Sequence, residues 1–392
     1  MRFDFDTVLD RRGTHSLKWD RCPVDFGLDD VIPMWVADMD FAAPPAVVEA
    51  IARRAAHGAY GYASVPESMW ASAIDWLRAR HGWAVERSWL GRAPGVVPAL
   101  NLCVRAFTEP GDGILVQTPV YYPFFHAVER NGRRLLRSPL AVDDGRYRMD
   151  FSDLERRIDE RTRLLILCSP HNPVGRVWTR EELERLGEIC VRRNLIVLSD
   201  EIHMDLVMPG HRHVPTASLS PALAERTVTL LAPSKTFNVA SLNLSLVVSS
   251  NPDLLARYEA EFNAAGLTIA SLFGTVALEA AYRHGAEWLD QLLAYLAGNV
   301  EFADRFIGER LPELRFIRPE GTYLALVDCR KLGMPQQELD EFLLRQARVY
   351  FDSGAWFGEE SAGFERINLA CPRARLAEAL QRLERAIRAR RA

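Results

Sequence analysis

The sequence predicts an α/β protein in which a large domain is built on a mainly parallel sheet and a smaller α+β domain accompanies it. Two observations predict this fold class. Short apolar runs alternate with helical patterns through the middle of the chain, and this alternation ends after about residue 250. With 392 residues, 48% of them hydrophobic, the chain is long enough for two domains with well-developed cores.

Five apolar runs in the middle of the chain are predicted to be strands. Each run is apolar on both faces, which is typical of strands in a parallel sheet that helices cover on both sides. The runs are Gly113–Gln117, Arg163–Cys168, Leu195–Ser199, Thr227–Leu231 and Leu244–Ser249.

A helix is predicted between two of these strands, over Thr179–Asn194. Thr179 can cap this helix, and Glu182 stands three residues further on, as in a capping box. Four apolar residues then fall on one face, which would pack on the sheet: Leu183, Leu186, Ile189 and Cys190. The order strand, helix, strand favours a mainly parallel sheet.

The remainder of the chain predicts the smaller domain. Asn251-Pro252-Asp253 opens a helix with a cap and a proline at its first position, and further helical patterns run through roughly 270–308. A strand and two more helices follow, at Thr322–Asp328, near Gln336–Arg345 and from about Ala374. The first ~45 residues lack regular periodicity, and we expect them to wrap over the cleft. We therefore predict a large domain of residues 46–285 and a small domain of residues 1–45 and 286–392.

Composition excludes several classes of protein. The net charge is −4 and acidic and basic residues are interspersed, so no basic patch predicts a nucleic acid partner. The N-terminus lacks the apolar core of a signal peptide, and no apolar run approaches the ~20 residues of a membrane span. The six cysteines are scattered without metal-ligand spacing. We therefore expect a cytoplasmic protein with reduced thiols, without a metal site and without a membrane partner.

Four chemically distinct side chains follow predicted strands. Asn172 comes after the strand that ends at Cys168, Asp200 after the next strand, Lys235 after Thr227–Leu231, and Tyr121 after the strand that begins at Gly113. Ligands of open α/β sheets bind outside the carboxyl ends of the strands. An amide, a carboxylate, an amine and an aromatic ring are thus expected to converge on one edge.

This set suits pyridoxal 5′-phosphate, which acts as an electron sink for a carbanion at the substrate α-carbon. Asp200 can keep the pyridine nitrogen protonated, because a nearby opposite charge favours the charged form. Asn172 can donate to the phenolic oxygen, and Tyr121 can stack on the ring. Lys235 is one of very few lysines among 48 basic residues. Near a pyridinium its pKa would fall, so that it could act as nucleophile and base.

The chain resembles the fold-type I, aspartate-aminotransferase-like enzymes that use pyridoxal phosphate, and more closely the MalY/PatB group of cystathionine β-lyase-like C–S lyases. The resemblance covers nearly the whole chain and rests on eight segments. They are MWVADMDF (34–41), HGAYGY (57–62), TPVYYPF (118–124), SPHNPVGRVWT (169–179), SDEIHMDL (199–206), APSKTFNVASL (232–242), EGTYLAL (320–326) and GFERINLACPR (363–373).

The resemblance implies roles around the cofactor. Lys235 would be the Schiff-base lysine, Asp200 the partner of the pyridinium, and Tyr121 the stacking residue. Asn172 and His203 would lie near the phenolic side of the ring. Ser234 and the backbone amides of a glycine-bearing turn that opens a helix would hold the phosphate, the amides being those of Gly95, Val96 and Val97.

The resemblance also implies a substrate site and a partner subunit. Arg366 would pair bidentately with the substrate α-carboxylate. Asn172, Ala37 and Tyr122 would line the same site. Tyr62 would reach the phosphate of the neighbouring subunit's cofactor, so the active unit is expected to be a homodimer with its sites at the subunit interface.

The expected reaction is β-elimination from an L-cysteine S-conjugate such as cystathionine, which gives a thiol, pyruvate and ammonia. An aminotransferase that uses the same site is the alternative, as is a biosynthetic variant that decarboxylates or deaminates a bulky cysteine conjugate. Ser241 and Leu326 keep the variant open, because the family usually has Gly and often Trp at these positions near the expected cleft. A regulator that binds cofactor without turnover is a different class; such regulators carry an extra DNA-binding domain, and none is expected here.

Overall fold

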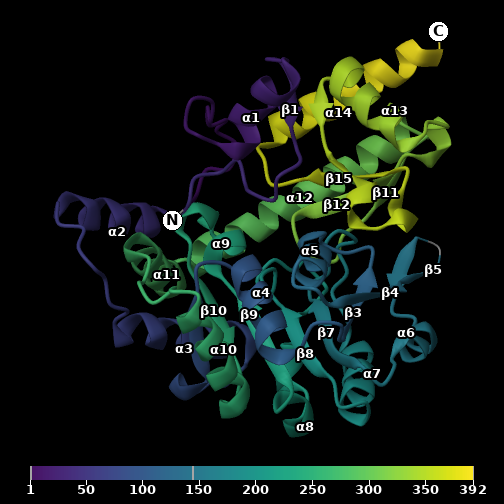
Figure 1. Ribbon diagram of the computed structural model, residues 1–392. Helices are drawn as coiled ribbons and strands as arrows, with labels where there is room; N and C mark the ends of the chain where they lie inside the picture. The colour runs from purple at the N-terminus through teal and green to yellow at the C-terminus, as the bar shows by residue number, and fades with distance from the viewer. Residues whose placement is uncertain (1, 144, 392) are drawn as a thin grey trace.

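The computed structural model describes residues 2–143 and 145–391. It contains a seven-stranded sheet, drawn in the lower half of Figure 1, and a four-stranded sheet in the upper half. This arrangement confirms the predicted α/β fold class.

The large sheet has the strand order β2-β10-β9-β8-β7-β3-β4. The five strands from β9 to β4 are parallel, whereas β10 runs antiparallel to both of its neighbours. The predicted strands are found within a residue of their expected ends. The bounds are β2 (Leu90–Ala93), β3 (Gly113–Thr118), β4 (Arg134–Pro139), β7 (Thr162–Cys168), β8 (Ile196–Asp200), β9 (Thr227–Leu231) and β10 (Ser245–Val248).

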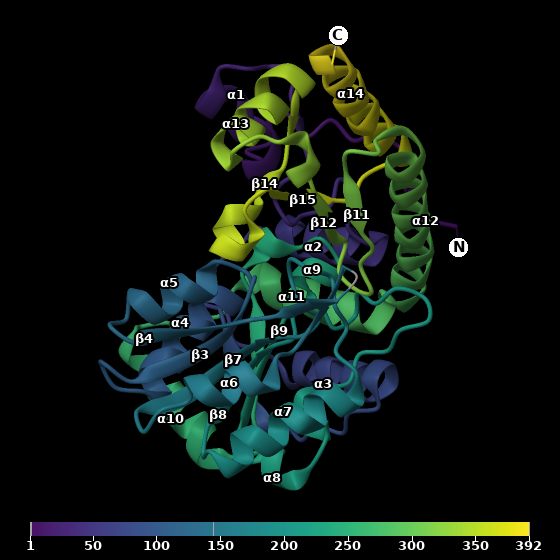
Figure 2. The ribbon, with the colours of Figure 1, turned by 90° about the vertical axis from the view of Figure 1, so that its right-hand side faces the viewer.

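Helices cover both faces of this sheet, as Figure 2 shows with α6 and α7 in front. Along β3, Ile114 and Val116 pack against α4 (Val96–Phe107), α5 (Pro123–Glu129) and α10 (Pro252–Ala264). Leu115 between them packs on the opposite side, among residues of α6 (Phe151–Arg157), α7 (Arg180–Arg192) and α8 (Pro221–Ala224). Both faces of the strand are therefore core, which explains its unbroken apolar run.

The predicted helix between β7 and β8 is α7. Thr179 caps it, and the reciprocal bonds of the capping box are formed: Glu182 N donates to Thr179 Oγ1 over 3.2 Å, and Thr179 N donates to Glu182 Oε2 over 2.9 Å. Asn251 likewise caps α10, with Pro252 at the first helical position. Both termini are specified by local sequence.

The small sheet is antiparallel, with the order β11-β12-β15-β14. The strand predicted over Thr322–Asp328 begins two residues later, at Leu324, because Thr322 adopts a left-handed backbone with φ of 67°. The helix predicted near Gln336–Arg345 changes to a π-helix after Glu341. The bounds are β11 (Arg315–Ile317), β12 (Leu324–Asp328), β14 (Asp352–Ser353), β15 (Phe364–Asn368), α12 (Ala286–Arg310), α13 (Gln336–Glu341) and α14 (Arg373–Arg391).

The N-terminal segment contacts the C-terminal part of the chain. After α1 (Leu17–Phe26), β1 (Ile32–Pro33) pairs in parallel with β13 (Val349–Tyr350). This pairing supports the proposed assignment of the first ~45 residues to the small domain, whose boundaries remain a proposal. The chain then continues through α2 (Pro45–Ala56) and α3 (Glu67–His81), and both helices pack against α11 (Leu272–His284).

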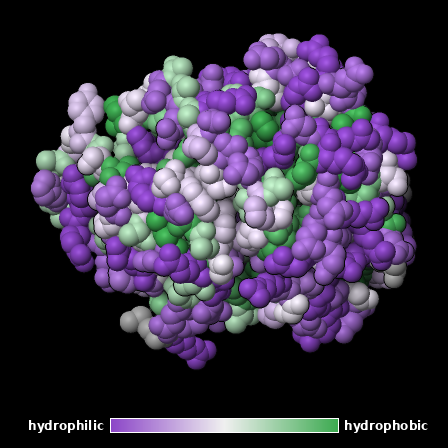
Figure 3. Space-filling model, turned by 90° about the horizontal axis from the view of Figure 1, so that it is seen from below, coloured by the Kyte–Doolittle hydropathy of each residue, from purple (hydrophilic) through white to green (hydrophobic). Residues whose placement is uncertain are grey.

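In the described part of the chain, the surface, the helices and the cysteines lack the features that a membrane segment, a disulfide or a metal site would require. Hydrophilic side chains predominate on the face seen in Figure 3, where hydrophobic ones form small separate areas. None of the helices in residues 2–143 and 145–391 is both long and apolar enough to cross a membrane. The six cysteines are buried free thiols. Within those residues, no three His, Cys, Asp or Glu side chains are grouped to hold a metal ion.

Candidate active site

The four side chains predicted to converge lie at the carboxyl ends of adjacent strands. Asp200 ends β8, Asn172 follows β7, Tyr121 follows β3, and Lys235 lies in the short helix α9 (Pro233–Thr236) directly after β9. Backbone contacts join the loops: Tyr121 N donates to Asn172 O over 3.1 Å, and Ser169 N donates to Asp200 O over 2.9 Å. The sheet thus brings the predicted residues together at one edge.

Lys235 points toward the N-terminal segment around Ala37. Its Nζ donates to the backbone carbonyl of Ala37 over 2.7 Å, and the hydroxyl of Tyr323 donates to the same carbonyl over 2.8 Å. Burial lowers the pKa of the Lys235 amine to about 8, an effect that Arg366 adds to and that Asp38 and Asp200 oppose. About a tenth of this amine is therefore neutral, and nucleophilic, at pH 7, far more than for a lysine with an ordinary pKa.

The short helix α9, which carries Lys235, is anchored by a buried carboxylate. Thr236 Oγ1 donates to Asp205 Oδ2 over 2.9 Å. The other oxygen, Oδ1, is bonded by Trp76 Nε1 over 3.1 Å and by His81 Nε2 over 2.7 Å. Burial raises the pKa of Asp205, but His81, Thr236 and Trp76 together lower it more, so the group stays ionised. These bonds hold in place the short helix that carries Lys235.

Asp200 is a buried carboxyl group that forms no ion pair with the residues that the structure describes. One oxygen accepts a hydrogen bond from Ile202 N over 3.1 Å. Burial raises the pKa of Asp200 to about 7, although this bond and Lys235 lower it. His203 is also buried; burial lowers its pKa to about 3, with Lys235 and Arg366 adding to the effect. Its Nδ1 has no hydrogen-bond partner among the residues that the structure describes.

These features fit pyridoxal phosphate. A protonated pyridine nitrogen would give Asp200 the cation whose absence leaves its pKa high. The unpartnered nitrogen of His203 would find polar atoms on the ring, because buried polar groups are normally hydrogen-bonded. Lys235 supplies the amine that an aldehyde needs.

Arg366 lies on the central strand β15 and is buried. Its Nη1 donates to Asn172 Oδ1 over 3.0 Å and its Nη2 to Trp35 O over 3.0 Å. Nη2 also forms an ion pair with Asp352, and the guanidinium lies over the Phe357 ring at 4.8 Å. Because Arg366 can only donate, the amide oxygen of Asn172 faces it and the amide nitrogen is left for another acceptor.

The predicted phosphate site has the expected backbone geometry. Gly95 is the N-cap of α4, so Val96 and Val97 are its first two residues. Their amides belong to the first turn of a helix, where N–H groups have no partner within the helix. Ser234 is half-buried beside Lys235. Binding of a phosphate here stays a prediction.

Two residues of the predicted site lie at its margins. The side chain of Tyr122 is half-buried, and its ring meets Trp356 with centroids 6.0 Å apart. Tyr62 lies between α2 and α3 and is 92% exposed, so it does not enter the site of its own chain. That it reaches the site of a neighbouring subunit remains a prediction.

The two departures from the family pattern differ in position. Ser241 is exposed in the turn after α9. Leu326 stands opposite Arg366 in the register of β12 and β15, yet it has no exposed surface and packs in a buried cluster. Leu326 therefore offers no surface at which a substrate could bind; it supports the strand that carries Arg366.

Several residues of the site were not found by sequence reasoning. Tyr323 shares the Ala37 carbonyl with Lys235, Asp352 pairs with Arg366, and Phe357 lies under its guanidinium. Tyr323 lies within the EGTYLAL segment, one of those on which the family resemblance rests, and this segment could have identified it as a site residue. Asp352 and Phe357 had no such signal, because the register of β14 on β15 brings Asp352 to Arg366, and Phe357 ends the helical turn Gly354–Phe357 that follows β14.

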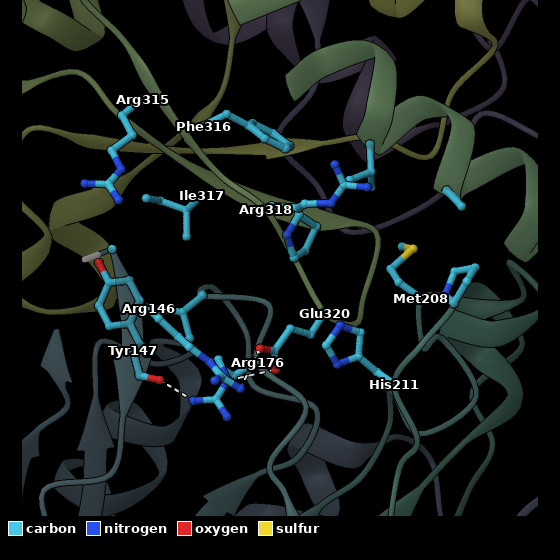
Figure 4. A pocket seen from close by; sticks show the side chains of 16 residues that line it. Arg146, Tyr147, Arg176, Met208, His211, Arg315, Phe316, Ile317, Arg318 and Glu320 are labelled. Atoms are coloured by element: carbon cyan, nitrogen blue, oxygen red, sulfur yellow. Dashed lines mark hydrogen bonds and ion pairs between the residues drawn. The ribbon is translucent and has the colours of Figure 1, made fainter. Parts of the chain in front are cut away.

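A separate cavity of about 480 Å³ lies beside β11 and α12, and none of the predicted site residues lines it. Figure 4 shows Arg146, Arg176 and Glu320 pointing toward one another at its base. Arg176 Nε bonds Glu320 Oε2 over 2.8 Å and Arg146 Nη2 pairs with Glu320 Oε1 over 3.1 Å. Because Gly175 O accepts the amide of Glu320 over 2.7 Å, this network holds the turn that carries Asn172.

Comparisons with known proteins agree with this site. Residues 29–383 match the family of class I and II aminotransferases. The chain is similar to cystathionine β-lyase PatB of Bacillus subtilis, with 43% identity over 98% of this chain and 100% of that protein. It is similar to protein MalY of Escherichia coli, with 34% identity and 99% coverage of both chains.

A solved structure gives the same result. Cystalysin from Treponema denticola, whose crystal structure contains a pyridoxal 5′-phosphate cofactor, superposes with a TM-score of 0.97. It shares 38% sequence identity, and the match covers 99% of this chain and 100% of cystalysin. Fold, site and sequence agree over the full length: the chain belongs to the class I and II aminotransferase family, whose enzymes depend on pyridoxal phosphate, and within it to the PatB and MalY group of carbon–sulfur lyases.

Proposed function

We propose that this protein is a pyridoxal-phosphate-dependent C–S β-lyase that cleaves L-cysteine S-conjugates, such as cystathionine-like thioethers, to a thiol, pyruvate and ammonia. One observation carries the proposal. The Lys235 amine, with a pKa of about 8, lies at the strand edge that also carries Asp200 and Asn172, within 2.7 Å of the Ala37 carbonyl. Two full-length relatives, one of them a cystathionine β-lyase by name, support the choice of a lyase.

The residues of this chain have separate tasks in the proposed reaction. Arg366 and Asn172 bind and orient the substrate carboxylate. Asp200 keeps a proton at the pyridine nitrogen. Bound pyridoxal phosphate supplies an electron sink for negative charge at the substrate α-carbon. Lys235, once its Nζ is free, removes the α-proton, because an amine with a pKa near the working pH is an effective general base.

The β-elimination balances without a further reactant except water. Lys235 Nζ takes the α-proton, and the Cβ–S bond breaks with its electron pair on sulfur. The ammonium of Lys235 can then return a proton to the thiolate. The remaining three-carbon enamine takes up one water to give pyruvate and ammonia. No external oxidant or reductant is needed.

A product assay tests the proposal. Purified protein loaded with pyridoxal phosphate is mixed with cystathionine and with a series of cysteine conjugates whose S-substituents increase in size. Pyruvate, ammonia and thiol should appear in equal amounts. A panel that gives neither pyruvate nor another keto product would exclude the lyase.

The same assay separates the lyase from an aminotransferase, the alternative that the family model keeps open. Transamination needs a second acid to accept the amino group. Turnover that depends on an added 2-oxo acid would therefore favour the aminotransferase, whereas turnover without it favours β-elimination. Carbon dioxide release would instead favour the decarboxylating variant.

A further inference from the structure

The predicted binding site for the substrate carboxylate, at Arg366, already contains a carboxylate side chain of the protein. Asp352 stands directly opposite Arg366 in the register of β14 and β15, and its Oδ2 forms an ion pair with Arg366 Nη2. Both side chains are almost fully buried, with 3% and 4% of their surface exposed. Solvent therefore screens this pair little, and the contact is one that an arriving carboxylate has to meet.

Arg366 has too few free N–H groups to bind Asp352 and a bidentate substrate carboxylate at the same time. A guanidinium offers a carboxylate two two-nitrogen edges, Nη1 with Nη2 and Nε with Nη2, and both include Nη2. The two protons of Nη2 are already directed to Trp35 O and to Asp352. Nη1 keeps one proton beyond its bond to Asn172, and Nε has no partner within the described chain. A substrate carboxylate can therefore bind at one nitrogen, but not across two.

Only Asp352 can release Nη2. The Trp35 carbonyl is part of a backbone that is bonded on either side, since Met34 N donates to Tyr350 O over 2.8 Å before it and Val36 O accepts from Asn368 Nδ2 over 2.7 Å after it. The Asp352 side chain, in contrast, can turn about its own bonds. Burial raises the pKa of Asp352 to about 6 although Arg366 lowers it, so the contact with Arg366 does not fully offset the cost of burying this carboxylate.

We propose that Asp352 is an internal competitor of the substrate: its carboxylate occupies the Arg366 nitrogen that bidentate binding of an amino acid requires, and it leaves when the amino acid binds. Two carboxylates on one buried guanidinium would repel each other, so the exchange is one for one. Asp352 thus lowers the affinity for every α-carboxylate ligand and sets the concentration range in which the enzyme works. The inference rests on the proposed role of Arg366.

Binding of a matched pair of ligands to the cofactor-loaded protein tests this. L-Alanine has no leaving group at Cβ, and ethylamine is the same molecule without its carboxylate. Dissociation constants come from calorimetry and from the change in cofactor absorbance, so that lyase activity is not the readout. Asp352→Asn keeps the size of the side chain and removes its charge. We expect it to bind L-alanine about tenfold more tightly than the parent protein, and ethylamine within twofold.

Two further variants make the result decisive. Asp352→Ala should tighten alanine binding in the same direction; equal or weaker binding by both Asp352 variants overturns the inference, because it means that Asp352 orients Arg366. Arg366→Ala should lower the affinity for alanine relative to ethylamine. If it does not, the carboxylate binds elsewhere and the inference also fails, whereas pyruvate release from cysteine conjugates tests the lyase separately.

Discussion

At the scale of single residues, Lys235 combines a lowered pKa with a side chain that a ligand can reach. Burial removes part of the solvation that stabilises an ammonium, so the pKa falls to about 8. The other lysines differ in position: Lys18 is buried and bonded to Asp40 over 2.9 Å, and Lys331 is exposed. Position, rather than residue type alone, therefore selects Lys235 for the aldehyde.

The first prediction concerns this lysine. Reduction of the cofactor-loaded protein with borohydride should fix the cofactor on the peptide that contains Lys235, as mass spectrometry would detect. Lys235→Ala should lose the yellow colour and lower lyase turnover by roughly 10²–10⁴-fold. Lys331→Ala is the matched control and should retain both. A cofactor found on another lysine would contradict the assignment.

The second prediction concerns Asp200. Its pKa rises from 3.8 to about 7 on burial, so between these values the unfolded chain loses a proton that the folded chain keeps. The cofactor-free protein should therefore lose stability as pH rises from about 4 to about 7, by up to roughly 4 kcal/mol from this group. Asp200→Asn should remove that part of the slope in urea unfolding and should weaken cofactor binding. The exposed Asp75→Asn is the control. An unchanged slope in Asp200→Asn would contradict the account.

At the scale of elements, the segment 34–41 is held by asparagines of other parts of the chain. Asn238, just after α9, accepts from Met39 N over 2.9 Å and donates to Met39 O over 2.9 Å and to Phe41 O over 2.8 Å. Asn368, at the end of β15, donates to Val36 O and Asp38 O. The Ala37 carbonyl that meets Lys235 therefore depends on contacts from both sheets.

The third prediction tests this attachment. Asn238 has a left-handed backbone with φ of 56°, which glycine adopts without strain. Asn238→Gly should thus remove three hydrogen bonds without adding strain, lower the free energy of unfolding by roughly 2–4 kcal/mol and accelerate hydrogen exchange at Met39 N. Asn243 has φ of 54° and is exposed. Asn243→Gly should cost less than about 1 kcal/mol, and equal losses in both variants would argue against a specific attachment.

The sequence predicted the caps and turns that depend on neighbouring residues. It did not predict the contacts that depend on how strands pair with one another. The cap at Thr179 and the turn at Gly95 were found because each needs only residues within a few positions. The antiparallel direction of β10 was not indicated, since a strand buried on both faces is apolar whichever way it runs. Asp352 and Leu326 flank Arg366 only through the pairing of β12, β15 and β14. No spacing along the chain shows that.

At the scale of the whole molecule, the described chain leaves part of its site region exposed. Tyr62 is 92% exposed, and Tyr60, Ile269 and Val97 are also large apolar residues with more than a third of their surface exposed. Tyr60, which follows α2, is in ring contact with Phe273 of α11 at 6.0 Å, and α2 itself packs on α11. A two-fold symmetric contact between two copies would bury such a surface. We therefore predict a homodimer, which sedimentation would detect.

The last prediction tests whether Tyr62 acts across that dimer. Lys235→Ala and Tyr62→Ala proteins are each expected to have low activity. In a mixed dimer, the subunit with intact Lys235 faces a partner with intact Tyr62, so one complete site forms, while the other site carries both defects. With equal amounts and random pairing, half of the dimers are mixed and each has one complete site of two, which gives about a quarter of the parent activity. If Tyr62 acted within its own subunit, every site in the mixture would keep one defect, and mixing would restore nothing.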